Sequence, residues 1–402
     1  MSDGRRRDST DTAQSSRMSN GDRIDGMSRE SWLARAGGAH DAQTGAVLPP
    51  LQPATTYGRD RDYRPISDAI YIRDDLPLSK DAERVIAALE GAADAMLFAS
   101  GMAAANALLM ALSPGTLVIA QSRLYFGVRA RLQQLEAQGR IGLQWFDCED
   151  LATLKAALRP GRATLVWGET PANPTWELLD IAAAAGIAHS SGAQLVIDST
   201  VATPLLTRPL ELGADIVLHS ATKFLNGHSD VLAGALAFRE RDALCDAVHV
   251  ERVAAGAVLG AFETWLLVRG MRTLDVRLQR CCASAQIIAA ALEHEPKVRR
   301  VRYPGLPSHP QHALARQQMQ GGYGALLSFE VTDGDAAALR VAGGLELIIR
   351  ATSLGGVESL IEHRATVEGA QSRLPPGLLR LSVGLENVDD LLSDLRGALS
   401  RL

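Results

Sequence analysis

Short apolar segments alternate with stretches of helical spacing between residues 81 and 221. The apolar segments are AMLFAS (95–100), TLVIAQS (116–122), ATLVWGE (163–169), QLVIDST (194–200) and DIVLHSA (215–221). Helical spacing appears at 81–92, 103–112, 125–139 and 180–192, and PLELG (209–213) is expected to form a short helix. Continuous apolar strands that alternate with helices predict an α/β fold with a mainly parallel sheet covered on both faces.

The pattern changes on either side of this region. Residues 1–30 are polar and lack an apolar run, which predicts a disordered tail. Residues 245–293 are mainly helical, and strands are expected at 324–331 and 378–384, before a helix that Asn387 would cap. We therefore expect an α/β domain over 81–254 and a smaller C-terminal α+β domain over 255–402.

Charge and cysteine usage exclude several classes of protein. The net charge of −5 provides no basic excess for binding nucleic acid. The uncharged window 95–122 contains turn residues and predicts strand, turn and helix rather than a membrane span. The four cysteines form no CxxC pair and have no histidine at a metal-ligand spacing, so we expect no metal site and a reduced, cytoplasmic protein.

Parallel sheets bind ligands at the carboxyl ends of their strands. The polar residues that follow the predicted strands are Ser100, Tyr125, Glu169, Asp198, Thr200, Ser220, Thr222 and Lys223. Lys223 stands out because the chain has only four lysines beside thirty-seven arginines. A lysine amine can act as a nucleophile once it loses its proton, whereas a guanidinium stays protonated.

Asp198 and Lys223 lie 25 residues apart, a spacing that suits one crossover between neighbouring strands. The two could form a structural ion pair. Alternatively they could hold pyridoxal phosphate, with the amine on the aldehyde and the carboxylate on the pyridine nitrogen. Ser100-Gly101-Met102 at a helix start could bind the phosphate, although an ordinary strand-to-helix turn would look the same. Tyr125 could stack on a planar ring.

The chain resembles the Cys/Met-metabolism family of pyridoxal-phosphate enzymes, which includes cystathionine γ-synthase and the cystathionine γ- and β-lyases. The resemblance covers about residues 45–402 and rests on a long segment, DSTVATPLLTRPLELGADIVLHSATKFLNGHSDVLAG (198–234). The segments FASGMAA, ETPANP, YPGLPSHPQH, SLGGVESLIEH and LLRLSVGLENVDDLL follow the family's order. The resemblance implies the fold of aspartate aminotransferase (fold type I), with an N-terminal arm over 31–80.

The resemblance also implies a role for each site residue. Lys223 would attach the cofactor, Asp198 would pair with its ring nitrogen, and Tyr125 would stack on the ring and protonate the leaving group. The phosphate would contact Gly101, Met102, Ser220 and Thr222, and Ser100 and Thr200 would also bind the cofactor. The substrate would contact Asn173, Ser353 and Arg380. Tyr71 and Arg73 would reach the phosphate of a neighbouring subunit, so we expect at least a dimer and, from the family, a tetramer.

The sequence departs from the family's pattern at three places: Leu76-Pro77-Leu78 after the Tyr71-x-Arg73 segment, Phe126-Gly127-Val128 after Tyr125, and Thr352 before the SLGG serine. The last two lie on the expected substrate side. We therefore expect an enzyme that makes or breaks a carbon–sulfur bond of cystathionine or an activated homoserine, most simply of the γ-lyase or γ-synthase type. A β-lyase is the first alternative, and an aminotransferase or a non-catalytic protein of this fold are more distant ones.

Overall fold

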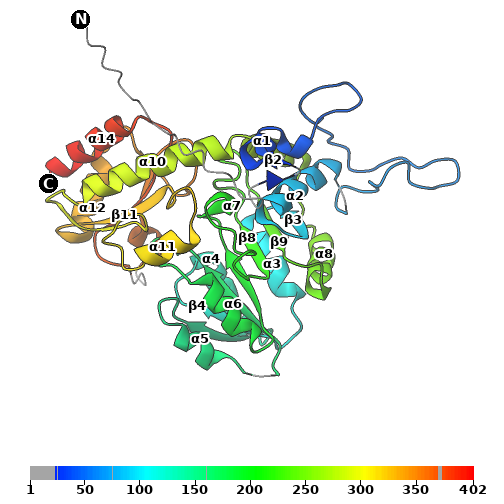
Figure 1. Cartoon of the computed structure of the whole chain (residues 1–402), viewed down its shortest axis with the longest axis horizontal. Helices are drawn as coiled ribbons and strands as arrows, with labels where there is room; N and C mark the ends of the chain where they lie inside the picture. The colour runs from blue at the N-terminus through cyan, green and yellow to red at the C-terminus, as the bar shows by residue number, and fades with distance from the viewer. Residues whose placement is uncertain (1–22, 25, 75, 160, 370–373) are drawn as a thin grey trace, which may run out of the picture.

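The computed structural model describes residues 23–402 apart from residues 25, 75, 160 and 370–373. The described chain forms a seven-stranded and a five-stranded sheet, and the long helix α10 (Leu274–Leu292) runs from the one toward the other (Figure 1). Nowhere in this described part is a helix both long and apolar enough to span a membrane.

The large sheet has the strand order β3-β9-β8-β7-β6-β4-β5. Its strands are β3 (Asp94–Phe98), β4 (Leu117–Gln121), β5 (Gly142–Phe146), β6 (Thr164–Glu169), β7 (Gln194–Asp198), β8 (Ile216–His219) and β9 (Gly234–Phe238). Strand β9 is antiparallel to both of its neighbours, and the other strand pairs are parallel. The mainly parallel sheet expected from the sequence is confirmed, but β5 and β9 were not recognised in the sequence.

Helices cover both faces of the large sheet (Figure 1). One apolar core contains Val166, Ile197 and Val217, and the other contains Trp167 and Val196. Successive side chains of a strand point to opposite faces, so each core lies on one side of the sheet. The helices are α2 (Pro77–Glu90), α3 (Gly101–Ala111), α4 (Phe126–Ala137), α5 (Leu151–Ala157), α6 (Ile181–His189), α7 (Thr203–Leu206), α8 (Ala243–Ala255) and α9 (Ala261–Met271).

Local sequence explains where several of these helices begin and end. Helix α2 begins with Pro77, which needs no hydrogen-bond partner there, and ends at Gly91 in the left-handed conformation. The short helix expected at 209–213 is wrong, because this segment forms turns and the helix lies earlier, in α7. A proline and a glycine within five residues leave too few good helix formers for a helical turn.

The second sheet has the order β10-β11-β14-β13-β12. Its strands are β10 (Val298–Arg302), β11 (Leu326–Val331), β12 (Ile349–Arg350), β13 (Leu360–His363) and β14 (Leu378–Ser382). Its helices are α11 (His312–Gln318), α12 (Gly334–Gly344), α13 (Arg364–Glu368) and α14 (Val388–Ser400). Asn387 caps α14 by accepting a hydrogen bond from the Asp389 N–H at 2.8 Å, as predicted.

The N-terminal region begins with the paired strands β1 (Arg23–Ile24) and β2 (Met27–Ser28), followed by α1 (Arg29–Ala34) and the 3₁₀ turn η2 (Ala36–Gly38). Most of the tail expected over 1–30 lies outside the described residues. Residues 39–74 extend from the body as loops (Figure 1). The expected domain limits near residues 80 and 254 stay predictions, and both positions fall inside helices, α2 and α8.

Candidate functional site

Strands β3, β4, β6, β7 and β8 end at one edge of the large sheet, and the predicted site residues gather along it. Lys223 follows β8 in a turn whose backbone closes with a hydrogen bond from the Lys223 N–H to the Ser220 carbonyl at 3.1 Å. Thr222 ties this turn to the start of β9, because its hydroxyl donates to the Ala233 carbonyl at 3.1 Å and accepts from the Ala233 N–H at 2.9 Å. The backbone that carries Lys223 is therefore held in place by hydrogen bonds.

The surroundings of Lys223 favour the neutral amine. The pKa of Lys223 is lowered from its ordinary 10.5 to about 8 by burial and by the nearby positive charge of Arg380, against the opposing effect of Glu362. The Nζ atom donates a hydrogen bond to the Ser353 hydroxyl at 2.7 Å. A lysine in this state is a nucleophile and a base near neutral pH, which an arginine cannot be.

Asp198 ends β7 and is buried. Its Oδ1 accepts hydrogen bonds from the Thr200 N–H at 3.0 Å and from the Thr200 hydroxyl at 2.6 Å. Burial raises the pKa of Asp198, while the Thr200 hydrogen bonds and the charge of His219 favour its charged form. A buried carboxylate of this kind needs a cationic partner, and the protonated nitrogen of a pyridine ring would be one.

The start of α3 offers a narrow cradle. Ser100 caps the helix by accepting a hydrogen bond from the Ala103 N–H at 3.0 Å. A Cβ on Gly101 would lie 2.9 Å from the Ser220 Cβ, and one on Gly234 would lie 2.1 Å from the Ser100 carbonyl oxygen. Side chains are therefore excluded where the helix N-terminus meets the lysine turn, which leaves backbone N–H groups to face an anion.

Hydroxyl groups join this cradle to Asp198. The Thr200 hydroxyl, which donates to Asp198, also accepts a hydrogen bond from the Ser220 N–H at 2.8 Å. Met102, the second residue of α3, lies close to the start of α4, since a Cβ added at Gly127 would be 3.1 Å from its sulfur atom. A reactive amine, a buried carboxylate and a helix start with no side chain in the way are the groups that pyridoxal phosphate requires, so the residues present fit this cofactor.

The three predicted substrate residues meet next to Lys223. Arg380, on β14, is buried and donates from Nη2 to the Ser353 carbonyl at 2.7 Å and from Nη1 to the Asn173 Oδ1 at 3.3 Å. Burial lowers the pKa of Arg380 to about 10. Ser353 has a φ of 82°, which is uncommon for a residue other than glycine. This conformation places one serine between the amine and the guanidinium.

Tyr125 lies at the start of α4, and its ring centroid is 4.7 Å from that of Phe126. Burial raises the pKa of the Tyr125 phenol, and the charge of Arg364 lowers it. The phenol therefore holds its proton at neutral pH, as a proton donor must.

Tyr71 and Arg73 behave differently from the other predicted site residues. Tyr71 is exposed, and the Arg73 guanidinium stacks 5.7 Å from the centre of its ring. Within the described residues, no hydrogen bond or ion pair joins either of them to the residues around Lys223. Their predicted role in a neighbouring subunit stays a prediction.

Two acidic residues at the site received no role from the sequence. Glu169 accepts hydrogen bonds from the backbone of both Tyr125 and Asn173. Glu362 forms an ion pair with Arg380 at 2.6 Å, because β13 and β14 pair these residues directly. Glu169 was noted only as a polar residue at a strand end, and Glu362 could not be found without the pairing of its strand.

His219, two positions before Ala221 in the lysine segment, contacts α2. Its Nε2 is 2.5 Å from the Oε1 of Glu90 at the end of α2, and both residues are buried. This contact fixes the end of β8 against α2.

Comparisons with known proteins agree with this geometry. The profile of the family described as "Cys/Met metabolism PLP-dependent enzyme" matches residues 30–400. The L-methionine gamma-lyase of Pseudomonas deceptionensis is 40% identical over 377 residues, which cover 89% of this chain and 94% of the relative. The cystathionine beta-lyase of Coxiella burnetii is 37% identical over 381 residues, which cover 91% of this chain and 96% of the relative.

A solved structure extends the likeness to three dimensions. The cystathionine gamma synthase of Xanthomonas oryzae pv. oryzae, in complex with cystathionine, matches with a TM-score of 0.88 and 37% identity, covering 93% of this chain and 98% of that one. The resemblance, the fold and the cofactor expected from the sequence are thus confirmed. The chain belongs to the Cys/Met metabolism family of pyridoxal-phosphate-dependent enzymes.

Proposed function

We propose that this enzyme makes or breaks a carbon–sulfur bond of a sulfur amino acid by elimination or replacement at the γ- or β-carbon. The observation that carries the proposal is the position of Ser353. Its hydroxyl accepts from the Lys223 amine at 2.7 Å, and its carbonyl accepts from Arg380 at 2.7 Å. A base and a carboxylate-binding group thus meet at one residue, as a reaction at the α-carbon of an amino acid requires.

Each residue then has one task. Arg380 and Asn173 bind the substrate carboxylate, and the Lys223 amine removes the proton from the α-carbon. Pyridoxal phosphate, when bound, supplies a ring that accepts the electrons left on that carbon. Asp198 would hold a proton on the ring nitrogen, and Tyr125 or Lys223 donates a proton to the leaving group. Loss of a leaving group from the γ-carbon also requires that a second proton be removed, from the β-carbon.

We infer a γ-specific enzyme of the cystathionine γ-lyase or γ-synthase type, with a cystathionine β-lyase as the alternative. Relatives named as a methionine gamma-lyase, a cystathionine gamma-synthase and a cystathionine beta-lyase are similarly close, at 40%, 40% and 37% identity. Phe126 and Thr352, which the resemblance puts on the substrate side, are exposed. These two residues are therefore the first candidates for setting the substrate.

The N-terminal arm supports a homo-oligomer, at least a dimer and in this family a tetramer. It exposes large apolar side chains at Val47, Tyr63 and Ile66, with exposed fractions of 80%, 78% and 72%. Large apolar side chains exposed along an extended arm suit a segment that another subunit covers. A second copy would cover it and would bring Tyr71 and Arg73 to the neighbouring phosphate.

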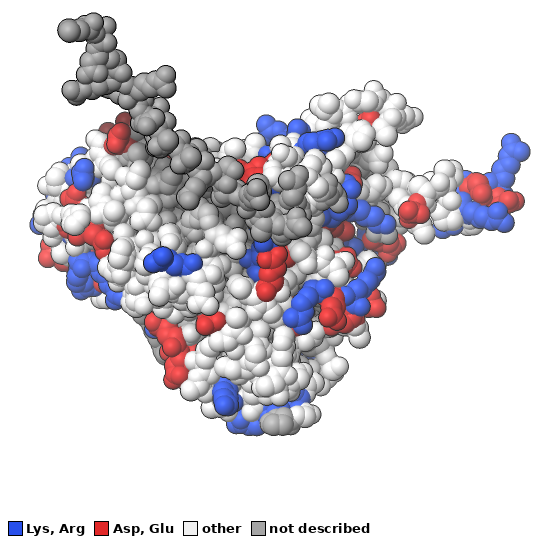
Figure 2. Space-filling model, viewed as in Figure 1, with Lys and Arg blue, Asp and Glu red and all other residues white. Residues whose placement is uncertain are grey.

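Two further properties of the chain bear on its surroundings. The four cysteines are free and buried, which suits a reducing compartment such as the cytoplasm. On the face shown in Figure 2, basic and acidic side chains are interspersed. This face offers no basic patch for nucleic acid, in line with a small-molecule substrate.

The test is the product formed from L-cystathionine by the cofactor-loaded protein, read by mass spectrometry. Formation of 2-oxobutyrate with cysteine means γ-elimination, and pyruvate with homocysteine means β-elimination. If cystathionine persists, the synthase direction is tested with cysteine and an activated homoserine. A protein that takes up no cofactor and converts none of these substrates would overturn the proposal.

A matched pair of variants assigns the lysine. Lys223→Ala is expected to lose both turnover and the yellow absorbance of the attached cofactor, since no amine remains to hold the aldehyde. Lys155→Ala, on the exposed side of α5, is expected to keep both. Retained absorbance in Lys223→Ala would mean that another residue holds the cofactor.

A further inference from the structure

We propose that Glu169 is a positioning residue that fixes Tyr125 relative to Asn173. The proton donor and the substrate carboxylate would then keep a constant position relative to each other. The inference rests on the proposed function of these two residues. It assigns a role to a buried acid that touches neither the cradle of α3 nor the lysine turn.

Glu169 reaches both residues through their backbones. Its Oε2 accepts a hydrogen bond from the Tyr125 N–H at 2.5 Å, and its Oε1 accepts one from the Asn173 N–H at 2.9 Å. The carboxylate is buried, with an exposed fraction of 5%. Both hydrogen bonds are shielded from water by the burial of this carboxyl group, so one side chain anchors two loops.

These two loops depend on side chains for their connection. The loop after β4 carries Tyr125 and the loop after β6 carries Asn173. In the part of the chain that the structure describes, no backbone-to-backbone hydrogen bond joins residues 122–126 to residues 170–177. Gln121 supports the inner link, because its Oε1 accepts from the Glu169 N–H at 3.1 Å and its Nε2 donates to the Arg123 carbonyl at 2.7 Å.

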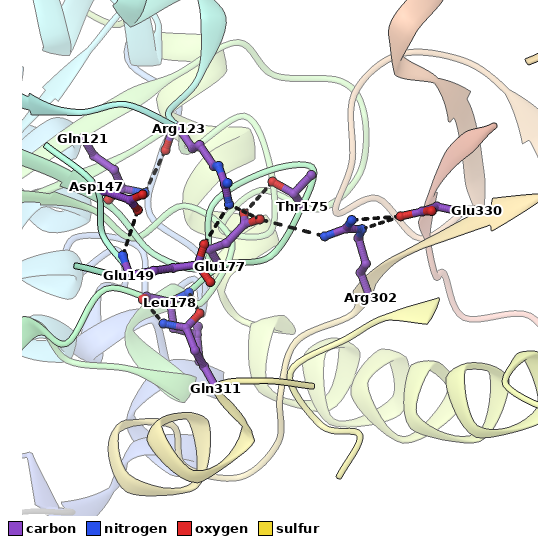
Figure 3. Close-up of polar contacts among 10 residues, drawn as sticks. All are labelled: Gln121, Arg123, Asp147, Glu149, Thr175, Glu177, Leu178, Arg302, Gln311 and Glu330. Atoms are coloured by element: carbon purple, nitrogen blue, oxygen red, sulfur yellow. Dashed lines mark hydrogen bonds and ion pairs between the residues drawn. The ribbon is translucent and has the colours of Figure 1, made fainter. Parts of the chain in front are cut away.

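A second link joins the same loops farther from the site (Figure 3). Arg123 forms an ion pair with Glu177 at 2.5 Å, and Arg302 continues the chain of contacts from Glu177 to Glu330, which it meets at 2.8 Å. The Arg123 side chain is 47% exposed, so water and salt weaken this outer pair. The outer link is thus a natural control for the inner one.

Burying Glu169 beside a second acid costs free energy of folding, so we expect this residue to have a function. Glu169 on β6 and Asp198 on β7 are paired directly, and neighbouring strands of a sheet lie about 5 Å apart. Burial, together with the charge of Asp198, raises the pKa of Glu169 to about 8. Only a carboxyl group offers an acceptor on both sides, because an amide would point its own N–H groups at one of the two backbone donors.

The experiment compares Glu169→Gln with Glu177→Gln in the cofactor-loaded enzyme. We expect Glu169→Gln to keep the cofactor absorbance and to lose about 10- to 100-fold in kcat, the size of effect that a small misplacement produces. Glu177→Gln is expected to stay within about twofold, because in the described structure Glu177 forms no hydrogen bond with Tyr125 or Asn173 and its partner Arg123 is 47% exposed.

A double-mutant cycle with Tyr125→Phe separates positioning from general damage. If Glu169 acts through the phenol, adding Glu169→Gln to Tyr125→Phe lowers kcat much less than it does in the wild type. Fully additive losses would overturn the proposal. A wild type without turnover would instead refute the proposed function, which keeps the two failures apart.

Hydrogen exchange gives a readout that does not depend on activity. Loss of an acceptor frees the Tyr125 or the Asn173 N–H, so peptides containing these residues are expected to exchange faster in Glu169→Gln but not in Glu177→Gln. Unchanged exchange in both peptides would overturn the proposal. Should Glu169→Gln fail to take up cofactor, Glu169→Asp tests the same point, because its shorter side chain can reach only one of the two donors.

Discussion

Replacing Lys223 with methionine is expected to stabilise the cofactor-free protein at neutral pH while abolishing its function. Burial lowers the pKa of this lysine from 10.5 to about 8. The folded protein therefore disfavours the charged amine, which is still protonated below pH 8. Methionine is a similarly long, unbranched side chain that carries no charge.

The magnitude follows from the two pKa values. A difference between 10.5 and about 8 corresponds to roughly 3 kcal/mol of lost stability. Because Lys223 keeps some access to water, we expect a gain of about 1–3 kcal/mol for Lys223→Met at pH 7. The unfolded state binds more protons than the folded state between pH 8 and 10.5, so the wild type recovers stability as the pH rises. The gain is expected to fall below about 1 kcal/mol at pH 10.

Urea denaturation of the cofactor-free proteins at pH 7 and pH 10 measures this gain, at one protein concentration because association adds to apparent stability. Lys155→Met, at an exposed position of α5, is the control and should change stability by less than about 0.5 kcal/mol at either pH. Equal stabilities of wild type and Lys223→Met at pH 7, or a gain that does not change with pH, would refute the reasoning.

Three further substitutions test other parts of the structure. Gly101→Ala places a Cβ 2.9 Å from that of Ser220 and is expected to weaken cofactor binding at least tenfold, measured by titration of absorbance. Arg252→Ala removes the partner of Glu83, to which it donates at 2.7 Å, and is expected to cost about 3–5 kcal/mol in urea denaturation because a largely buried acid loses its charge partner. Asn387→Ala removes the cap of α14 and should cost about 1 kcal/mol in the same assay.

The sequence predicted the parts of the fold that depend on local pattern. The apolar runs that became β4, β6, β7 and β8 are continuous, because helices cover both of their faces. Strand β5 was not predicted because it lies at the sheet edge and is only partly buried. Strand β9 was not predicted because it follows the lysine loop directly, without the helix that precedes a parallel strand.

The site residues also fall into those that local sequence predicts and those that it does not. Asp198 and Lys223 could be paired from residue type and spacing, because each follows an apolar strand. The meeting of Asn173, Ser353 and Arg380 came from the resemblance, since they lie far apart in the chain. The dual contact of Glu169 and the pairing of Glu362 with Arg380 depend on loop closure and on strand order, which a sequence read by itself does not reveal.

The ion pair between Arg380 and Glu362 bears on which ligands the site can select. The guanidinium already has a carboxylate 2.6 Å away on the adjacent strand. Arg364 shares that carboxylate at 3.3 Å and also pairs with Glu368 at 3.2 Å, so the two arginines are matched by two carboxylates before a substrate arrives. A ligand that brings only a carboxylate would leave an excess negative charge in a region of low dielectric, whereas a zwitterion brings its own compensating ammonium. The charged residues of these neighbouring β-strands would thus favour the binding of free amino acids over keto acids, which lack the ammonium group.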